Sequence, residues 1–206
     1  MCAFALEPSA ALFENDSVKV TRALEKAHVK GSFHEHKLNR VMVYLESGRQ
    51  RFEYQDGRQP AVFDWKAGQV VWSPSEGMHS PEVVSDDPFN IIEIEVKKPV
   101  GGNVVTAGQD ALKVDGKHYK LEFENDQVRV LRMTLGARQS TPMIEESRNR
   151  VAVFLSDQEI RTTDLKGAVE TATHKRGEAI WQAAKAEKME NAGDGQPEMV
   201  LVELKN

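Results

Sequence analysis

Cysteine is nearly absent from this chain of 206 residues, in which Cys2 is the only one. A disulfide within the chain is therefore excluded, and a reducing compartment is favoured. No apolar run approaches the ~20 residues that a membrane-spanning helix needs. The N-terminal residues also lack the basic start and long apolar centre of a secretory signal. We therefore expect a soluble, cytoplasmic protein with no membrane partner.

Basic residues are too dispersed to form a nucleic-acid surface. The formal net charge is -5, and no run of Lys or Arg is dense enough to follow a phosphate backbone. The sequence also lacks a Cys-x-x-Cys pair, a phosphate-cradling glycine loop and a Ser, His and Asp arrangement. A nucleic-acid partner is therefore not expected, and any catalysis would have to depend on other groups.

What the chain does contain is an internal repeat. The segment LFENDSVKV (12–20) returns as EFENDQVRV (122–130), and the same shift of 110 residues carries NRVMVYL onto NRVAVFL. Further on, AGQVVW matches RGEAIW, and IIEIEV matches VLVEL. Four matches in the same order predict two homologous units. We expect an N-terminal domain over residues 1–98, a linker over 99–116 and a C-terminal domain over 117–206.

Both units have the composition of β-structure. Short segments rich in Val, Ile and aromatic residues alternate with turn signals that contain Gly, Pro and Asp. Helical periodicity is scarce, and the one helix-like stretch, 183–190, is expected to be a loop or turn because of its place in the repeat. Many short antiparallel strands in two copies predict an all-β fold of two tandem jelly-roll barrels, also called double-stranded β-helices.

Three histidines of the first unit are candidate metal ligands. His34 and His36 are one residue apart, so on a strand their side chains point the same way, roughly 6 to 7 Å apart along the backbone. Two imidazoles in that geometry can share one ion. His79, which follows a turn containing Pro74 and Gly77, is the candidate third ligand from a neighbouring strand. The alternative is a set of surface or hydrogen-bonded histidines without a metal.

These residues resemble the two motifs of the cupin superfamily. In outline the first motif reads Gly, five residues, His-x-His, three or four residues, Glu, six residues, Gly; the second reads Gly, five residues, Pro-x-Gly, two residues, His. Apart from the spacing between Pro and Gly in the second motif, the chain supplies His34, His36, Gly48, Gly68, Pro74, Gly77 and His79. Together with the repeat, the resemblance covers nearly the whole chain and implies a bicupin with a metal site in its first barrel.

The chain departs from the cupin pattern where the metal-binding Glu should stand. Three residues separate His36 from Arg40, and four separate it from Val41, so neither expected position carries a carboxylate. The resemblance then implies three neutral ligands, as in cupins similar to the thiol dioxygenases or diketone dioxygenases. A divalent ion held this way keeps its charge and open positions, which favours an anionic, bidentate substrate. Iron, nickel, copper, zinc and manganese all remain candidates. Arg40 recurs as Arg150, which favours a structural role shared by both units.

The substrate pocket and the catalytic groups are predicted only from nearness to these histidines. Tyr44, Glu46 and Glu82 are the candidate catalytic groups, and the sequence shows no clear general base. The remaining histidines are expected to be solvated. The candidate pocket residues are Val41, Val43, Tyr44 and Met78, and the remaining histidines are His28, His118 and His174.

The second unit lacks the three histidines. In the repeat register the same positions carry Ile144, Glu146, and either Glu187 or Lys188. No ordinary metal site is expected there, so this barrel would serve stability and packing, or Glu146 and Lys188 would line a metal-free pocket. Its segments FENDQVRVLRM and ENAGDGQPEMVLVELKN also resemble small single-domain cupins assigned to β-alanine breakdown.

Three functions follow from these observations. The first, which the three histidines favour, is a metal-dependent oxygenase or isomerase acting on a small carboxylated metabolite. The second is a non-enzymatic protein that binds or senses a small ligand. The third is a scaffold whose barrels serve assembly, for instance as a homodimer. Fold resemblance does not separate them, because jelly rolls support many chemistries.

Overall fold

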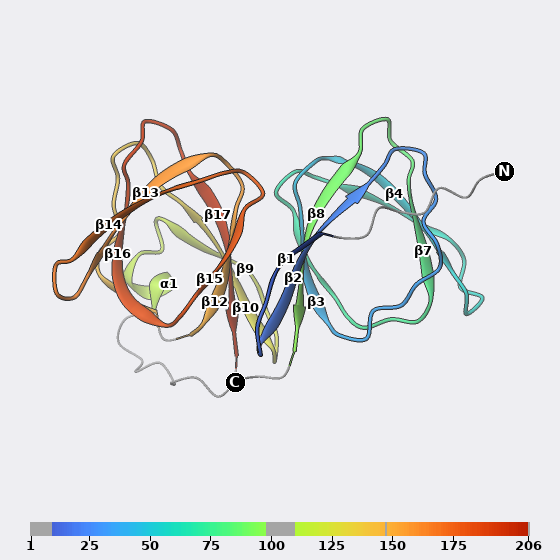
Figure 1. The fold of residues 1–206 in the computed structure, drawn as a ribbon, viewed down its shortest axis with the longest axis horizontal. Helices are drawn as coiled ribbons and strands as arrows, with labels where there is room; N and C mark the ends of the chain where they lie inside the picture. The colour runs from blue at the N-terminus through green and yellow to red at the C-terminus, as the bar shows by residue number, and fades with distance from the viewer. Residues whose placement is uncertain (1–9, 98–109, 147, 206) are drawn as a thin grey trace. The chain divides into compact units, whose positions relative to one another are not determined.

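The computed structural model describes residues 10–97, 110–146 and 148–205. The chain forms two compact units, Met1–Lys98 and Pro99–Asn206. Each unit is a barrel of antiparallel strands (Figure 1), which confirms the predicted all-β fold. The one helix among the described residues is α1 (Ala111–Val114), a single turn within the predicted linker. It is too short to cross a membrane. The earlier part of the predicted linker lies outside the described residues.

The first barrel consists of two sheets. The five-stranded sheet has the order β1-β2-β8-β3-β6, and the three-stranded sheet has the order β5-β4-β7. The strands are β1 (Ala10–Glu14), β2 (Val18–Glu25), β3 (Arg40–Tyr44), β4 (Gly48–Tyr54), β5 (Ala61–Trp65), β6 (Val70–Ser73), β7 (His79–Val83) and β8 (Phe89–Val96).

The second barrel repeats this order. Its five-stranded sheet runs β9-β10-β17-β12-β15, and its second sheet runs β11-β16-β13-β14. β11, which the first barrel has no named strand to match, pairs with β16. The strands are β9 (Tyr119–Glu124), β10 (Val128–Thr134), β11 (Ile144–Glu146), β12 (Arg150–Phe154), β13 (Gln158–Asp164), β14 (Val169–His174), β15 (Ala179–Gln182), β16 (Lys185–Asn191) and β17 (Glu198–Leu204).

The repeated letters END in the sequence form the same turn in both barrels. The Asn15 side chain accepts hydrogen bonds from the backbone amides two and three residues later, at 2.8 and 3.0 Å. The Asn125 side chain does the same at 2.9 and 3.0 Å. An Asn side chain can replace a backbone carbonyl in a tight turn, which is why this residue fits between two strands.

Strand register decides which side chains of the first barrel face inward. β3 pairs with β8 so that Arg40 lies opposite Glu95 and Met42 lies opposite Glu93. Directly paired residues share one face of a sheet. Met42 also belongs to the buried core cluster with Tyr44, so Arg40, two residues away along β3, is carried on this same inner face.

Gly48, at the start of β4, is required by close packing. A Cβ atom there would lie 2.5 Å from the Ser85 hydroxyl and 2.8 Å from the Phe89 ring. These distances are well inside van der Waals contact, so a larger side chain would displace a buried ring. Close packing therefore explains why a glycine stands at this position of the first cupin motif.

The stretch 183–190 differs from expectation, since most of it is strand β16 and not a loop. The side chains of Glu187, Met189 and Asn191 are buried, with less buried residues between them. β16 pairs with β13, whose residues lie more than twenty positions earlier in the chain. This long-range pairing outweighs the local helical preference of Ala, Glu and Lys.

Candidate metal centre

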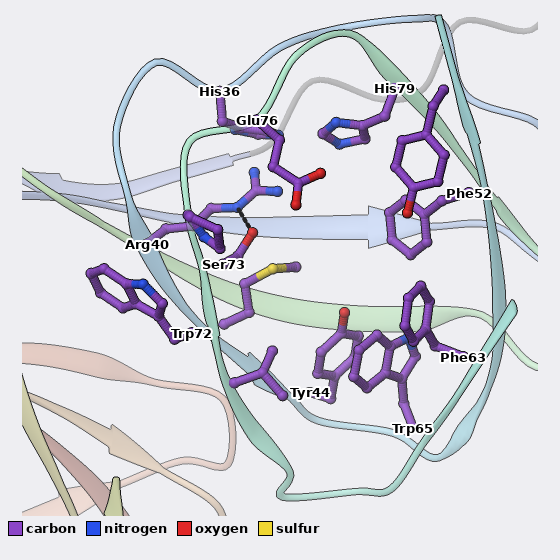
Figure 2. A pocket seen from close by; sticks show the side chains of 14 residues that line it. His36, Arg40, Tyr44, Phe52, Phe63, Trp65, Trp72, Ser73, Glu76 and His79 are labelled. Carbon is purple, nitrogen blue, oxygen red and sulfur yellow. Dashed lines mark hydrogen bonds between the residues drawn. The ribbon is translucent and has the colours of Figure 1, made fainter. Parts of the chain in front are cut away.

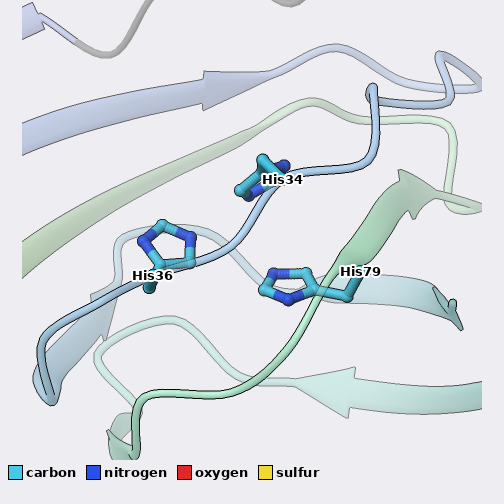
Figure 3. A group of neighbouring side chains, drawn as sticks. All are labelled: His34, His36 and His79. Carbon is cyan, nitrogen blue, oxygen red and sulfur yellow. The ribbon is translucent and has the colours of Figure 1, made fainter. Parts of the chain in front are cut away.

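His34, His36 and His79 come together in the first barrel. His79 is the first residue of β7, and His34 pairs with it in an isolated antiparallel bridge. Two backbone hydrogen bonds of 2.9 Å join this pair. His36 lies beyond the bridge, outside any strand, so the expected His-x-His strand is reduced to this one pairing. Figure 3 shows the three rings gathered at one place.

The three rings are arranged as a ligand set requires. Ring centroids are 4.9 Å apart for His34 and His36, and 4.7 Å apart for His34 and His79. One nitrogen from each ring can be chosen so that all three lie within 4.8 Å of one another. Metal–nitrogen bonds of about 2.1 Å hold two ligands at most about 4.2 Å apart. Small side-chain rotations therefore suffice to close the set around one ion.

Backbone carbonyls fix the tautomers of two of these rings. His34 Nδ1 lies 3.0 Å from the carbonyl oxygen of Ser32, and His79 Nδ1 lies 3.2 Å from that of Gly77. A carbonyl only accepts hydrogen bonds, so each Nδ1 carries the proton and each Nε2 keeps its lone pair. This is the orientation that supporting groups commonly give to metal-binding histidines.

The surroundings of His36 and His79 favour the uncharged form of these two imidazoles. Burial, together with the positive charge of Arg40, lowers the pKa of His36 to about 3. Burial also lowers the pKa of His79, although its hydrogen bond to Gly77 opposes the change. Neutral imidazole is the form that binds metal ions. His36 also has Glu95 nearby, with 3.7 Å between Nδ1 and Oε1.

A cavity of about 200 Å³ opens beside His36 and His79 (Figure 2). Its far wall is aromatic. Tyr44 and Trp65 stack with their centroids 4.2 Å apart, and Phe63 stacks on Trp65 at 5.4 Å. Phe52 connects this wall to the histidines, since its ring lies 5.8 Å from that of His79. Such a cavity suits a small molecule with an apolar part.

Arg40 supplies a positive charge to the same cavity. Only 4% of the residue is exposed. Its Nε donates to the Ser73 hydroxyl at 3.3 Å, as the dashed line in Figure 2 shows. Its Nη1 lies 3.5 Å from the Glu93 carboxylate and has no hydrogen-bond partner among the described residues. This residue stands where the cupin pattern places a carboxylate ligand.

Of the four predicted pocket residues, one lines the cavity and three do not. Tyr44 lines the cavity, whereas Val41 and Val43 do not. Both valines are fully buried on the other face of β3, because side chains alternate along a strand. Met78 also lies outside the cavity wall. The catalytic candidates Glu46 and Glu82 are outside it too, and the Glu46 carboxylate accepts a hydrogen bond from the Asn90 amide at 2.6 Å.

A buried polar network behind the aromatic wall was not expected from the sequence. The Gln50 side chain donates to Glu25 at 2.6 Å and accepts from the Trp65 indole at 2.9 Å. Burial, together with the nearby Glu93, raises the pKa of Glu25 to about 7, although the hydrogen bond from Gln50 opposes the change. Glu25 ends β2, where the sequence gives no sign of burial; only the closure of the barrel places it inside.

In the second barrel a buried ion pair replaces the histidines. Ile144 pairs with Glu187 in the sheet just as His34 pairs with His79, so Glu187 is the counterpart of His79. Its Oε1 lies 3.1 Å from Nη2 of Arg150. Both side chains are 2% exposed. Glu146 belongs to β11, and its side chain lies outside the described residues.

A second cavity, of about 350 Å³, lies in this barrel. Trp181, Met189 and Met199 line it, together with Glu170 and other residues. Lys188, which the sequence placed at a metal-free pocket, is not among the lining residues. The cavity contains no cluster of metal-binding groups among the residues that the structure describes.

The histidines outside the motifs do not share one environment. His28 is exposed and lies 3.0 Å from Asp86, as expected of a solvated residue. His118 is instead buried, and its Nδ1 lies 2.8 Å from the Asp115 carboxylate. His174 stacks on Phe154 with a centroid distance of 3.8 Å. The expectation of solvation is therefore wrong for these two, because both rings have partners within the second barrel.

Comparison with solved structures identifies the architecture. AerE from Microcystis aeruginosa has a TM-score of 0.70 and 14% identity, over 98% of this chain and 95% of that one. A cupin 2 conserved barrel domain protein from Leptotrichia buccalis has a TM-score of 0.59 and 14% identity, over 100% of this chain and 92% of that one. A variant of oxalate decarboxylase from Bacillus subtilis has a TM-score of 0.63 and 10% identity, over 98% of this chain and 76% of that one.

Two tandem jelly-roll barrels, one of which contains a three-histidine cluster, define the class of this protein. The chain has the cupin fold twice, so its architecture is that of a bicupin, as the sequence motifs predicted. No protein-family model matches the sequence, and no curated protein matches it. At identities of 10 to 14% the likeness establishes the fold alone.

Proposed function

We propose that the first barrel binds a divalent metal ion through His34, His36 and His79 and is an enzyme of small-molecule metabolism. The reaction class is an oxygenation or isomerisation of a small carboxylated compound. One observation carries this proposal: three ligand nitrogens lie within 4.8 Å of one another, and two of the three histidines line a cavity of about 200 Å³.

The ligand set supports a catalytic site over a structural one. Structural metal sites are usually closed by four protein ligands, whereas catalytic sites have three and leave a position open. Imidazole ligands suit iron, nickel, copper or zinc. Manganese is a further candidate, because among the structural neighbours the Bacillus subtilis oxalate decarboxylase has Mn(II) centres. When bound, such an ion supplies a Lewis acid with open positions for a ligand.

The chain's own residues would bind and orient the substrate. Arg40 presents a cation at one side of the cavity, and Trp65 and Phe63 present an apolar wall at the other. Burial raises the pKa of Tyr44, so its hydroxyl remains protonated and donates to Gln50 at 3.4 Å. Tyr44 is thus part of the wall, and the same ring excludes water from the interior of the barrel.

Metal content tests the proposal directly. Protein purified without chelators should contain one divalent ion per chain by elemental analysis. The double variant His34→Ala, His79→Ala should contain none. The matched control is His28→Ala, His174→Ala, which removes two histidines outside the cluster and should keep the ion. Equal metal content in the two double variants would exclude this site.

A ligand-binding protein without turnover is the second candidate. It is favoured because the cavity wall offers no free carboxylate base among the described residues: Glu76 is paired with Arg58 at 3.3 Å. Oxygen consumption and product formation, measured with a panel of small carboxylic acids, separate the two candidates. A ligand that raises Tm but yields no product would support the second.

A further inference from the structure

Arg40 has unused capacity to bind an anion. Its guanidinium is almost completely buried, yet Nη1 makes no hydrogen bond within the part of the chain that the structure describes. Its ionic neighbour Glu93 lies 3.5 Å away, outside hydrogen-bonding geometry. A buried charged donor without a hydrogen bond is costly, because water no longer solvates it. Arg40 faces the cavity, so a ligand there can supply the missing bond.

The second barrel shows what this arginine position binds. Arg150 is the repeat counterpart of Arg40, and each donates from Nε to the residue opposite it in the sheet, Ser73 or Gln182. In the second barrel Nη2 of Arg150 also contacts a carboxylate, that of Glu187, at 3.1 Å. Glu187 takes the place of His79. The same barrel geometry therefore places a carboxylate between this arginine and the site of the third histidine.

We propose that the substrate of the first barrel is an aryl or arylalkyl carboxylate whose carboxylate lies between Arg40 and the three histidines, bound to both the guanidinium and the metal ion. This inference rests on the proposed metal site. The ligand's carboxylate takes the part that Glu187 plays in the second barrel. In the cupin pattern a protein carboxylate binds the metal, and Arg40 stands at its position in this chain. The ligand's carboxylate would replace that missing protein ligand.

The charges around the cluster require such an anion. A divalent ion with three neutral imidazoles keeps its full charge, and the guanidinium of Arg40 adds another. Glu93 offsets only part of this charge, and Glu95 is shared with Lys19, whose Nζ lies 3.9 Å away. Glu76 also lines the cavity, but its carboxylate is paired with Arg58 at 3.3 Å. Guanidinium binds carboxylate through its planar fork, so the anion is oriented as well as held.

The aromatic wall defines the other end of the ligand. From His79 it continues through Phe52 and Phe63 to Trp65, each pair of neighbouring rings lying 5.8 Å apart or less. Flat rings favour stacked or edge contacts with another ring. A volume of about 200 Å³ limits the ligand to one ring with a short side chain.

Three small probes test the inference on the cobalt(II)-loaded protein. Phenylacetate has both the ring and the carboxylate, phenylacetamide is its uncharged counterpart, and acetate lacks the ring. Binding is followed by the visible absorption of cobalt(II), which reports coordination directly. We expect phenylacetate to bind at least about tenfold more tightly than phenylacetamide, the usual effect of one charged hydrogen bond. It should also bind more tightly than acetate, which cannot make the ring contacts with the aromatic wall.

The variant Arg40→Gln identifies the anchor. It should load cobalt(II) as the wild type does but bind phenylacetate at least about tenfold more weakly. Arg40→Lys should restore part of the affinity, since it returns the charge without the fork. The control Arg51→Gln removes an arginine that pairs with Glu53 outside the cavity and should bind like the wild type.

The two proposals fail in different ways. A wild type that takes up no cobalt(II) would overturn both. Normal cobalt(II) loading, with phenylacetate binding unaffected by Arg40→Gln, would overturn only the inference. If Arg40→Gln does not fold, the wild type still decides: equal binding of phenylacetate and phenylacetamide would show that no cationic anchor acts on the ligand.

Discussion

Arg150 and Glu187 form a buried ion pair in the second barrel at the positions that Arg40 and His79 occupy in the first. Glu187 thus presents a carboxylate where the first barrel has an imidazole. The Glu187 carboxylate pairs with the arginine inside the protein, whereas in the first barrel we propose that a ligand carboxylate does so. The two barrels thus differ in what surrounds the same buried arginine, Arg40 in the first and Arg150 in the second.

Removing Glu187 should strongly destabilise the chain. The variant Glu187→Gln leaves Arg150 buried without its countercharge, and breaking a buried pair costs about 3–5 kcal/mol. Urea denaturation should show this loss in the free energy of unfolding. The control Lys185→Met removes the other, half-exposed cation near Glu187 and should cost less than about 1 kcal/mol. Similar midpoints for the two variants would show that the pair does not stabilise the barrel.

Alanine at Gly48 should destabilise the first barrel. The added Cβ would overlap the Ser85 hydroxyl and the Phe89 ring, and overpacking of this kind costs about 1–3 kcal/mol. Gly77→Ala is the matched control, because no atom lies within 4 Å of its added Cβ. Thermal denaturation compares the two. Equal Tm values would mean that the ring of Phe89 moves aside at no cost.

Protonation of Glu25 should contribute to the pH dependence of stability. Burial raises the pKa of Glu25 from 4.5 to about 7, so between these values the folded protein retains a proton that the unfolded chain releases. The contribution of Glu25 to the free energy of unfolding is therefore complete below pH 4.5 and falls as the pH rises to about 7. The total change should be about 1 to 3 kcal/mol.

The variant Glu25→Gln isolates this contribution. His36, whose pKa is lowered to about 3, acts in the opposite direction over part of the same range, so only the difference between wild type and variant is informative. The stability of Glu25→Gln relative to wild type should increase from pH 4.5 to pH 7 in urea denaturation. A constant difference would show that Glu25 is solvated in the folded protein.

Metal ions should stabilise the folded protein through His36. A ligand that binds only the folded state at 100 times its Kd adds about 2.7 kcal/mol. Divalent ion should raise Tm in the wild type, chelator should reverse the change, and His36→Ala should show no response. His118→Ala removes a buried histidine of the second barrel and should still respond to the ion. A response in His36→Ala equal to that of the wild type would argue against this ligand.

Much of the architecture could be predicted because its signals are local. Asn15 and Asn125 form their turns with amides two and three residues later, so the repeated END letters are sufficient to indicate them. The alternation of β-branched residues likewise marks strands. The segment 183–190 was misjudged because strand β16 is stabilised by pairing with β13, which local sequence does not reveal.

The site was predicted less completely than the fold. Motif spacing identified the three histidines that the structure brings together. It did not identify the inner face of β3, because residues 40–44 are all buried and no alternation of polar and apolar letters distinguishes the two faces. The register with β8 decides that Met42 and Tyr44 face the cavity, while Val41 and Val43 face away.

The sequence by itself determined the duplication, the β-strands and the three histidines, since each depends on residue type and on spacing along the chain. Only the tertiary structure decided that Arg40 points into the cavity, that Glu25 meets Gln50 and that Glu187 replaces His79. These facts depend on which strands become neighbours and in what register. Barrel closure fixes both through contacts between residues far apart in the chain.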